Sequence, residues 1–157
     1  MKTQLARGLM LAALFAFPAA PALADTTGDS APLKRCCGGD TGPYKDFGEK
    51  AGIERLMRDF MEGLLADPRT RPFFEGQNKE RIILQLTDQL CYALEGPCEY
   101  GGRPMRATHQ GMGVSRREFN ALVEVLQTSM NKAGIPFRSQ NRMLAVFAPM
   151  ERDVVTR

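Results

Sequence analysis

Apolar side chains recur at three- and four-residue steps along most of this chain, and glycine or proline interrupts them at intervals. Between residues 52 and 65, for example, apolar positions mark one helical face and charged residues mark the other. Such spacing predicts amphipathic helices, because about 3.6 residues make one helical turn. No stretch of several residues alternates strictly between apolar and polar side chains, as a half-buried strand would. The sequence therefore predicts an all-α fold.

Local signals divide this pattern into separate helices. Asp67-Pro68 ends the first one, since the residue before a proline disfavours helical geometry, and a short helical turn follows that stops at Gly76. Asn78 is placed to cap the next helix, which runs to about Leu94.

The third long helix has a capping-box pattern at its start. Ser115 and Glu118 stand three residues apart, as that motif requires, and Gly134 is the expected stop. A last helix begins near Ser139, and we expect Pro149 to kink it rather than end it.

The first 24 residues have the three parts of a secretory signal peptide. Lys2 and Arg7 supply a basic start, residues 9–17 an apolar centre, and residues 22–24 a small-residue cleavage site. The apolar run is shorter than the roughly 20 residues of a bilayer span. The sequence therefore predicts an exported protein, periplasmic if the source is a Gram-negative bacterium.

The remaining chain is long enough for one domain and is close to neutral. Removing 24 residues from 157 leaves 133, and the loss of Lys2 and Arg7 takes the formal charge from +3 to +1. Such a chain has no electrostatic reason to bind nucleic acid or a membrane surface. Residues 25–43 are rich in Gly, Pro, Asp and Thr, which indicates a flexible leader before a domain at 44–157.

Four cysteines, Cys36, Cys37, Cys91 and Cys98, remain after cleavage and allow three pairings. A local bridge between Cys91 and Cys98 is feasible if the chain turns back after the helix. Cys36 and Cys37 are adjacent, so a partner elsewhere is as good a reading as a small ring between them. Unpaired thiols remain an alternative.

His109 is the only histidine in the chain. Met105, His109 and Met112 fall on one face of a short helical segment, and a neutral imidazole beside soft apolar side chains suits iron or zinc. No Cys or His spacing converges on His109 to complete a zinc shell, whereas a haem iron needs a single protein ligand. The alternative is an ordinary core or surface histidine. No CxxCH motif indicates covalent haem attachment.

An ordered set of short motifs runs along the chain. The most specific of them precedes the histidine: Ala93-Leu94-x-Gly96-Pro97-x-x-Tyr100-x-Gly102-Arg103-x-Met105, then His109. Others are Tyr44-x-x-Phe47-Gly48, Leu65-Ala-Asp-Pro68, Pro72-Phe73-Phe74, Ala133-Gly134-Ile135-Pro136 and Asp153-Val154-Val155. Together they resemble a group I truncated haemoglobin, a two-over-two helical globin that binds haem b. The resemblance covers residues 44–155.

The resemblance implies that His109 is the protein ligand of the haem iron. It implies that the walls of the haem pocket are Phe60, Met61, Phe74, Ile82, Leu86, Leu90, Met105, Met112, Phe119 and Leu122. Arg81, Arg103 and Arg106 are candidates to pair with the haem propionates.

The sequence departs from the family at several positions. Glu49 and Glu95 each replace one glycine of a Gly-Gly pair. Met61 and Leu86 stand where family members usually carry a tyrosine and often a glutamine that hydrogen-bond bound oxygen. Without such donors, we expect fast oxygen release and weak discrimination against carbon monoxide. Gln85 and Gln89, each one turn further along, could reach in.

Two classes of function follow from the resemblance. The favoured one is reversible capture of oxygen, nitric oxide or carbon monoxide for storage, sensing or delivery outside the cytoplasm. The alternative is a haem redox enzyme, such as a nitric oxide dioxygenase, or an electron-transfer protein, including one in which Met61 is a sixth ligand. A redox enzyme or an electron-transfer protein would need an unidentified electron donor, since nothing in the sequence resembles a flavin or nicotinamide module. A helical domain that has lost its haem is a third reading.

Overall fold

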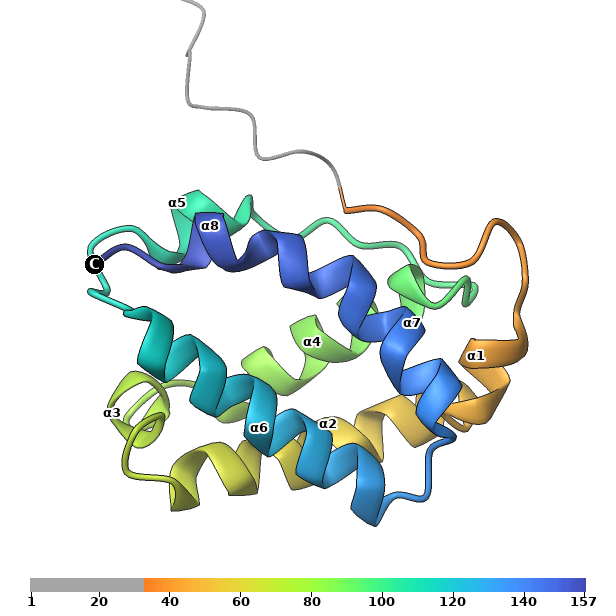
Figure 1. Ribbon diagram of the computed structural model, residues 1–157, viewed down its shortest axis with the longest axis horizontal. Coiled ribbons are helices and arrows are strands. Elements are labelled where there is room, and N and C mark those ends of the chain that lie inside the picture. The colour runs from red at the N-terminus through yellow and green to blue at the C-terminus, as the bar shows by residue number, and fades with distance from the viewer. Residues whose placement is uncertain (1–32) are drawn as a thin grey trace, which may run out of the picture.

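The computed structural model describes residues 33–157, and within that range it is helical without strands (Figure 1). The expected signal peptide and the first part of the expected leader, residues 1–32, lie outside the described residues. The elements are α1 (Gly42–Asp46), α2 (Glu49–Ala66), α3 (Arg71–Phe74), α4 (Lys79–Ala93), α5 (Met105–His109), α6 (Arg116–Lys132), α7 (Phe137–Phe147), the 3-10 turn η1 (Ala148–Met150) and α8 (Glu151–Val154). The all-α prediction is confirmed.

Two pairs of helices form the body of the molecule. Helix α2 packs against both α4 and α6, and α4 also meets α7. In Figure 1, α6 and α7 diverge from the turn that joins them, and α5 lies beside α8 near the C-terminus. The core lies where α2 crosses its partners, and α2 alone buries Ile53, Leu56, Met57, Phe60, Met61 and Leu64.

The predicted starts of two long helices are confirmed by their caps. The Asn78 side chain accepts a hydrogen bond from the Arg81 N–H at 3.0 Å. At α6, the Glu118 carboxylate accepts from the Ser115 N–H at 2.9 Å, and the Ser115 hydroxyl oxygen accepts from the Arg117 N–H at 3.2 Å. Each cap satisfies backbone donors that the first helical turn leaves without partners.

One boundary differs from the sequence-based expectation, because helix α1 begins at Gly42, inside the stretch expected to be a leader. The last helix behaves as expected at its proline. Helix α7 reaches Phe147, and Pro149 lies in the 3-10 turn η1 that leads directly into α8. Proline has no N–H to donate to the fourth residue before it, so Pro149 distorts the helical path without ending it.

Both glutamates that replace family glycines adopt the left-handed backbone that glycine favours. The φ angle is +56° at Glu49 and +68° at Glu95. This conformation brings the Cβ of an ordinary residue close to its own backbone. The turns therefore kept the glycine geometry although the glycine was replaced.

All four cysteines are paired, Cys91 with Cys98 and Cys36 with Cys37. The local bridge at the end of α4 is the one that the spacing made feasible. The bond between the adjacent cysteines settles the alternative that the sequence left open.

None of the helices in the described range is long and apolar enough to cross a membrane.

Candidate functional site

His109 is the last residue of α5, and its ring is half-buried. Its Nδ1 lies 2.8 Å from the carbonyl oxygen of Met105, one turn earlier. A carbonyl only accepts, so Nδ1 carries the proton and the lone pair of the imidazole is on Nε2. A backbone carbonyl at Nδ1 is the usual partner that fixes the ring of a metal-binding histidine.

The C-terminal segment holds α5 in place. Arg106 on α5 forms an ion pair with Asp153 on α8, with Nη2 and Oδ1 3.0 Å apart. Just after α5, Val114 exchanges hydrogen bonds with Thr156, at 2.8 Å and 3.1 Å. Gly111 has a φ angle of +77°, which ends the helix directly after the histidine. His109 is therefore oriented by its own helix, and that helix is fixed by the end of the chain.

Half-buried apolar side chains lie on three helices. They pack against the core and keep part of their surface uncovered: Ile82 and Leu86 on α4, Leu122 on α6, and Leu144 and Phe147 on α7. Exposed apolar surface of this kind is unfavourable in water. A flat apolar group that covered these side chains would therefore be stabilised.

The residues expected to form the pocket walls fall into three groups. Phe60, Met61 and Leu90 are at most 4% exposed and belong to the core. Phe74, Ile82, Leu86, Met105, Phe119 and Leu122 are half-buried. Met112 is 41% exposed, more than any other residue of this set.

The three arginines differ in their contacts. Arg106 is engaged with Asp153. The side chain of Arg103 is exposed and donates only a long hydrogen bond, 3.4 Å, to the carbonyl of Ala107. Arg81 is also exposed, and only its backbone N–H is engaged, as the donor to the Asn78 cap of α4. Arg103 and Arg81 therefore keep guanidinium donors for an anionic partner, whereas Arg106 already has one.

The two glutamines considered for the distal side, Gln85 and Gln89, differ in how far they are buried. Gln85 is exposed, while Gln89 is only 5% exposed and shares a helical stripe with Ile82 and Leu86. Gln140, equally buried, donates to Asn131 and to the Ile135 carbonyl, but the Gln89 amide has no hydrogen bond to another residue of the described range.

The expected pocket walls do not include Leu144 and Phe147 on α7, which are half-buried against the core. Their three-residue spacing puts them on one helical face, which is the signal that the sequence offered. Within residues 33–157 there is no group of three His, Cys, Asp or Glu side chains that could hold a metal ion.

Comparison with known proteins identifies the family. Residues 43–156 match the model of the bacterial-like globins, and the chain belongs to that family. It is 30% identical over 112 residues to a group 1 truncated hemoglobin of Tetrahymena pyriformis, covering 71% of this chain and 93% of the relative. It is 29% identical over 113 residues to the group 1 truncated hemoglobin GlbN of Mycolicibacterium paratuberculosis, covering 72% and 83%.

Solved structures show the same architecture. The crystal structure of truncated hemoglobin from Tetrahymena pyriformis in its Fe(III) form matches with a TM-score of 0.69 at 26% identity, over 73% of this chain and 98% of that one. The fold is therefore the two-over-two fold of truncated haemoglobins. As a globin, the chain takes haem with its iron as cofactor and a diatomic gas as ligand.

The residues of this structure fit that cofactor. The His109 imidazole, with its Nε2 lone pair available, suits the iron. The incompletely covered apolar side chains on α4, α6 and α7 suit the porphyrin ring. The exposed Arg103, just before the histidine helix, suits a propionate.

Proposed function

We propose that His109 ligates the haem iron through Nε2 and that the chain reversibly binds oxygen, nitric oxide or carbon monoxide. The observation that supports this most is the hydrogen bond from Nδ1 to the Met105 carbonyl, 2.8 Å long. It fixes the tautomer and makes Nε2 a better electron donor. When bound, haem would supply an iron that takes a diatomic gas.

The walls of the proposed pocket come from four helices. Ile82 and Leu86 on α4 form the distal wall, Met105 lies on the histidine side, and Leu122 and Phe147 close the pocket from α6 and α7. Their apolar surface excludes water from the ring. Phe60, Met61 and Leu90 lie in the core, with Met61 behind the distal wall, whereas Phe74 and Phe119 are half-buried and Met112 is exposed at the rim.

Arg103 is the propionate partner that we favour. It precedes α5, its side chain is exposed, and it has no carboxylate partner in the described range. Arg106 is excluded from that role here, because its guanidinium is bound to Asp153. Arg106 instead positions His109 by holding α5 against α8.

The distal wall determines how long a gas stays. Met61, Ile82 and Leu86 have no group that donates a hydrogen bond to a bound gas. Gln89, buried in the same stripe, is the donor that we consider available, whereas Gln85 is exposed. We infer a globin that releases oxygen faster than one with a distal tyrosine.

Reversible binding is favoured over a redox enzyme. The chain has a single histidine, so a second imidazole cannot act as an acid or base near the gas. Turnover of nitric oxide would also need electrons from another protein. Met61 is 2% exposed within the hydrophobic core, and its packing accounts for it without a role as a sixth ligand.

The test is spectroscopic. The purified protein should carry haem, and its reduced form should bind one carbon monoxide per chain with a change in the Soret band. A protein that neither retains nor takes up haem would overturn the proposal. Steady consumption of nitric oxide when a reductase is supplied would favour the enzyme instead.

We also propose that the protein is exported after cleavage behind Ala24. The support is the signal pattern in the sequence together with four cysteines that are all paired, as oxidising compartments favour. N-terminal sequencing of the secreted protein should begin at Asp25. A full-length protein in the cytosol with free thiols would contradict export.

A further inference from the structure

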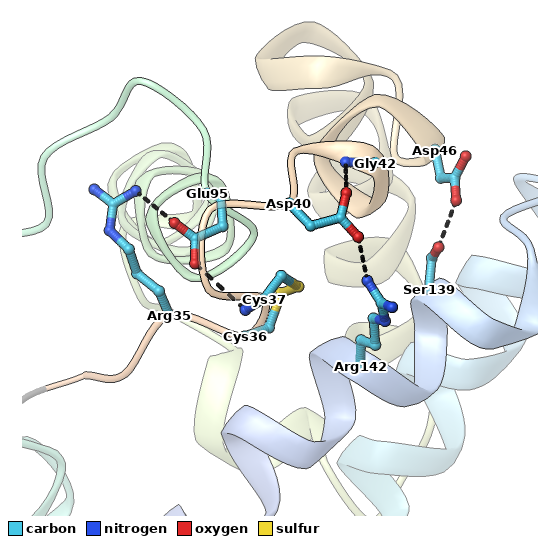
Figure 2. Close-up of a disulfide and its surroundings, with 9 residues drawn as sticks. All are labelled: Arg35, Cys36, Cys37, Asp40, Gly42, Asp46, Glu95, Ser139 and Arg142. Atoms are coloured by element: carbon cyan, nitrogen blue, oxygen red, sulfur yellow. Dashed lines mark hydrogen bonds and ion pairs between the residues drawn. A yellow bond between two sulfur atoms is a disulfide. The ribbon is translucent and has the colours of Figure 1, made fainter.

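A short segment before α1 fastens the end of α4 to α7. We call residues 35–40 the N-terminal clasp; it includes the Cys36–Cys37 disulfide (Figure 2). The Cys36 N–H donates to the carbonyl of Ala93, the last residue of α4, at 2.8 Å. Contrary to the flexible leader that its composition suggests, this part of the chain is tied to the domain.

Charged groups complete the attachment. The Glu95 carboxylate accepts from the Cys37 N–H at 3.3 Å and pairs with Arg35 at 3.2 Å. At the other end, Asp40 pairs with Arg142 on α7 at 2.6 Å. Figure 2 shows the disulfide between these two anchors, with Glu95 on one side and Asp40 on the other.

Glu95 links the clasp to the backbone of the α4 end. Its left-handed φ angle of +68° is unfavourable for a glutamate, and its side chain is only 8% exposed. Such a conformation persists where surrounding contacts determine it. Here those contacts are the ones that Arg35 and Cys37 make to its carboxylate.

The two disulfides differ in accessibility. Cys91 is fully buried and Cys98 is 9% exposed, whereas Cys36 and Cys37 are only half-buried. Thiol–disulfide exchange requires a thiolate to reach a sulfur atom. A reductant should therefore attack Cys36–Cys37 before Cys91–Cys98.

We propose that Cys36–Cys37 is a thiol–disulfide exchange site for dithiols and that its reduction releases the clasp from α4. A dithiol thiolate attacks one sulfur and displaces the other cysteine, and the second thiol of the dithiol then displaces the first. The Sγ–Sγ bond breaks, the two cysteines gain two electrons and two protons, and the dithiol is oxidised to its disulfide.

Release follows from the covalent geometry. The disulfide closes a ring that contains the Cys36–Cys37 peptide. The N–H of Cys36 donates to Ala93 and the N–H of Cys37 donates to Glu95, both at the end of α4. Opening the ring lets the backbone on each side of that peptide rotate. The two hydrogen bonds to the end of α4 are then no longer held in place by the ring, and they open more often. The proposal concerns the chain itself and does not depend on haem binding.

The experiment titrates the full purified chain with dithiothreitol, alkylates free thiols and locates them by mass spectrometry. Amide hydrogen exchange is measured on the same samples. We expect Cys36 and Cys37 to be alkylated first, and their amides to exchange roughly tenfold faster or more, while α6 stays protected. Reduction of Cys91–Cys98 first or together with Cys36–Cys37 would overturn the proposal, as would unchanged exchange after Cys36–Cys37 is reduced.

A double variant provides the matched control. Cys36→Ser with Cys37→Ser should exchange as fast as the reduced protein before any reductant is added, and should not change when it is added. Protection like that of the oxidised wild type in this variant would show that the disulfide does not hold the clasp. Reduced wild-type protein serves the same comparison if the variant folds poorly.

Discussion

One backbone atom orients the His109 ring. The Met105 carbonyl accepts a hydrogen bond from Nδ1–H, so the ring presents Nε2 without help from a carboxylate. The sequence placed both residues one helical turn apart, but only the structure shows the hydrogen bond between them.

Met61 offers the most direct test of the distal wall. Changing Met61→Tyr would place a hydroxyl where family members carry a donor. A hydrogen bond to a partly charged bound gas is worth about 1.5–3 kcal/mol, so we expect oxygen to leave roughly ten- to a hundredfold more slowly. Stopped-flow displacement of oxygen by carbon monoxide measures this rate. Met61→Phe, which adds a ring without a donor, should leave release fast; equal slowing by both would argue against the hydrogen bond.

Gln89 carries the second prediction. Gln89 is 5% exposed, lies on the stripe of Ile82 and Leu86, and has no side-chain hydrogen bond to another described residue. A hydrogen bond from its amide to the partly charged bound gas would be worth about 1.5–3 kcal/mol. We expect Gln89→Leu to speed oxygen release roughly ten- to a hundredfold and to shift the carbon monoxide stretching frequency. Gln85→Leu, at an exposed position, is the control. An unchanged rate and frequency in Gln89→Leu would remove Gln89 from the site.

Glu49 and Glu95 allow a paired comparison. Both have a left-handed backbone, but only Glu95 has contacts from Arg35 and Cys37. Glu49→Gly should raise the free energy of unfolding by about 0.5–1 kcal/mol by removing backbone strain. Glu95→Gly should gain less or lose stability, because the clasp loses its anchor. Urea unfolding measures both; equal gains would mean that the Glu95 carboxylate contributes nothing.

At the scale of the elements, α6 depends on its cap. Hydrogen bonds from the Ser115 hydroxyl and then from its N–H hold the pKa of Glu118 below the ordinary value. The cap therefore stabilises the protein above the unfolded-state pKa of about 4.3, and this stability is lost as the pH falls through the lower folded-state pKa.

Removing that carboxylate should flatten the acid response. Between pH 6 and pH 3, Glu118→Gln should lose less stability than the wild type, because its side chain does not titrate. Urea unfolding followed by helical circular dichroism at each pH provides the comparison. Glu99→Gln, an exposed glutamate, should respond as the wild type does. If Glu118→Gln also keeps the full acid dependence, the cap is not its source.

Sequence periodicity predicted the helices well where apolar faces and caps agree. Asn78 and Ser115 mark helix starts by local hydrogen bonds, which neighbouring residues determine. Helix α1 was harder to predict, because tertiary packing decides whether so short a stretch becomes helical. The bond between Cys36 and Cys37 could not be predicted either, since pairing depends on where the chain lies in space.

At the scale of the whole molecule, segments near the two ends of the described range each hold one helix in place. The C-terminal residues hold α5 through Asp153 and Thr156, and the N-terminal clasp holds the end of α4. These helices carry the histidine and the distal wall of the proposed pocket. Sequence motifs indicated both walls, whereas contacts between residues more than 40 positions apart required the structure.

The central claim is that His109 Nε2 holds the haem iron. The absorption spectrum of reduced His109→Gly, with and without added imidazole, tests it most directly, and Gln110→Ala, an exposed neighbour, is the control. We expect the wild-type Soret band to be altered or lost in His109→Gly, unchanged in Gln110→Ala, and restored when imidazole fills the space of the missing ring. A Soret band in His109→Gly identical to that of the wild type, without imidazole, would contradict the account.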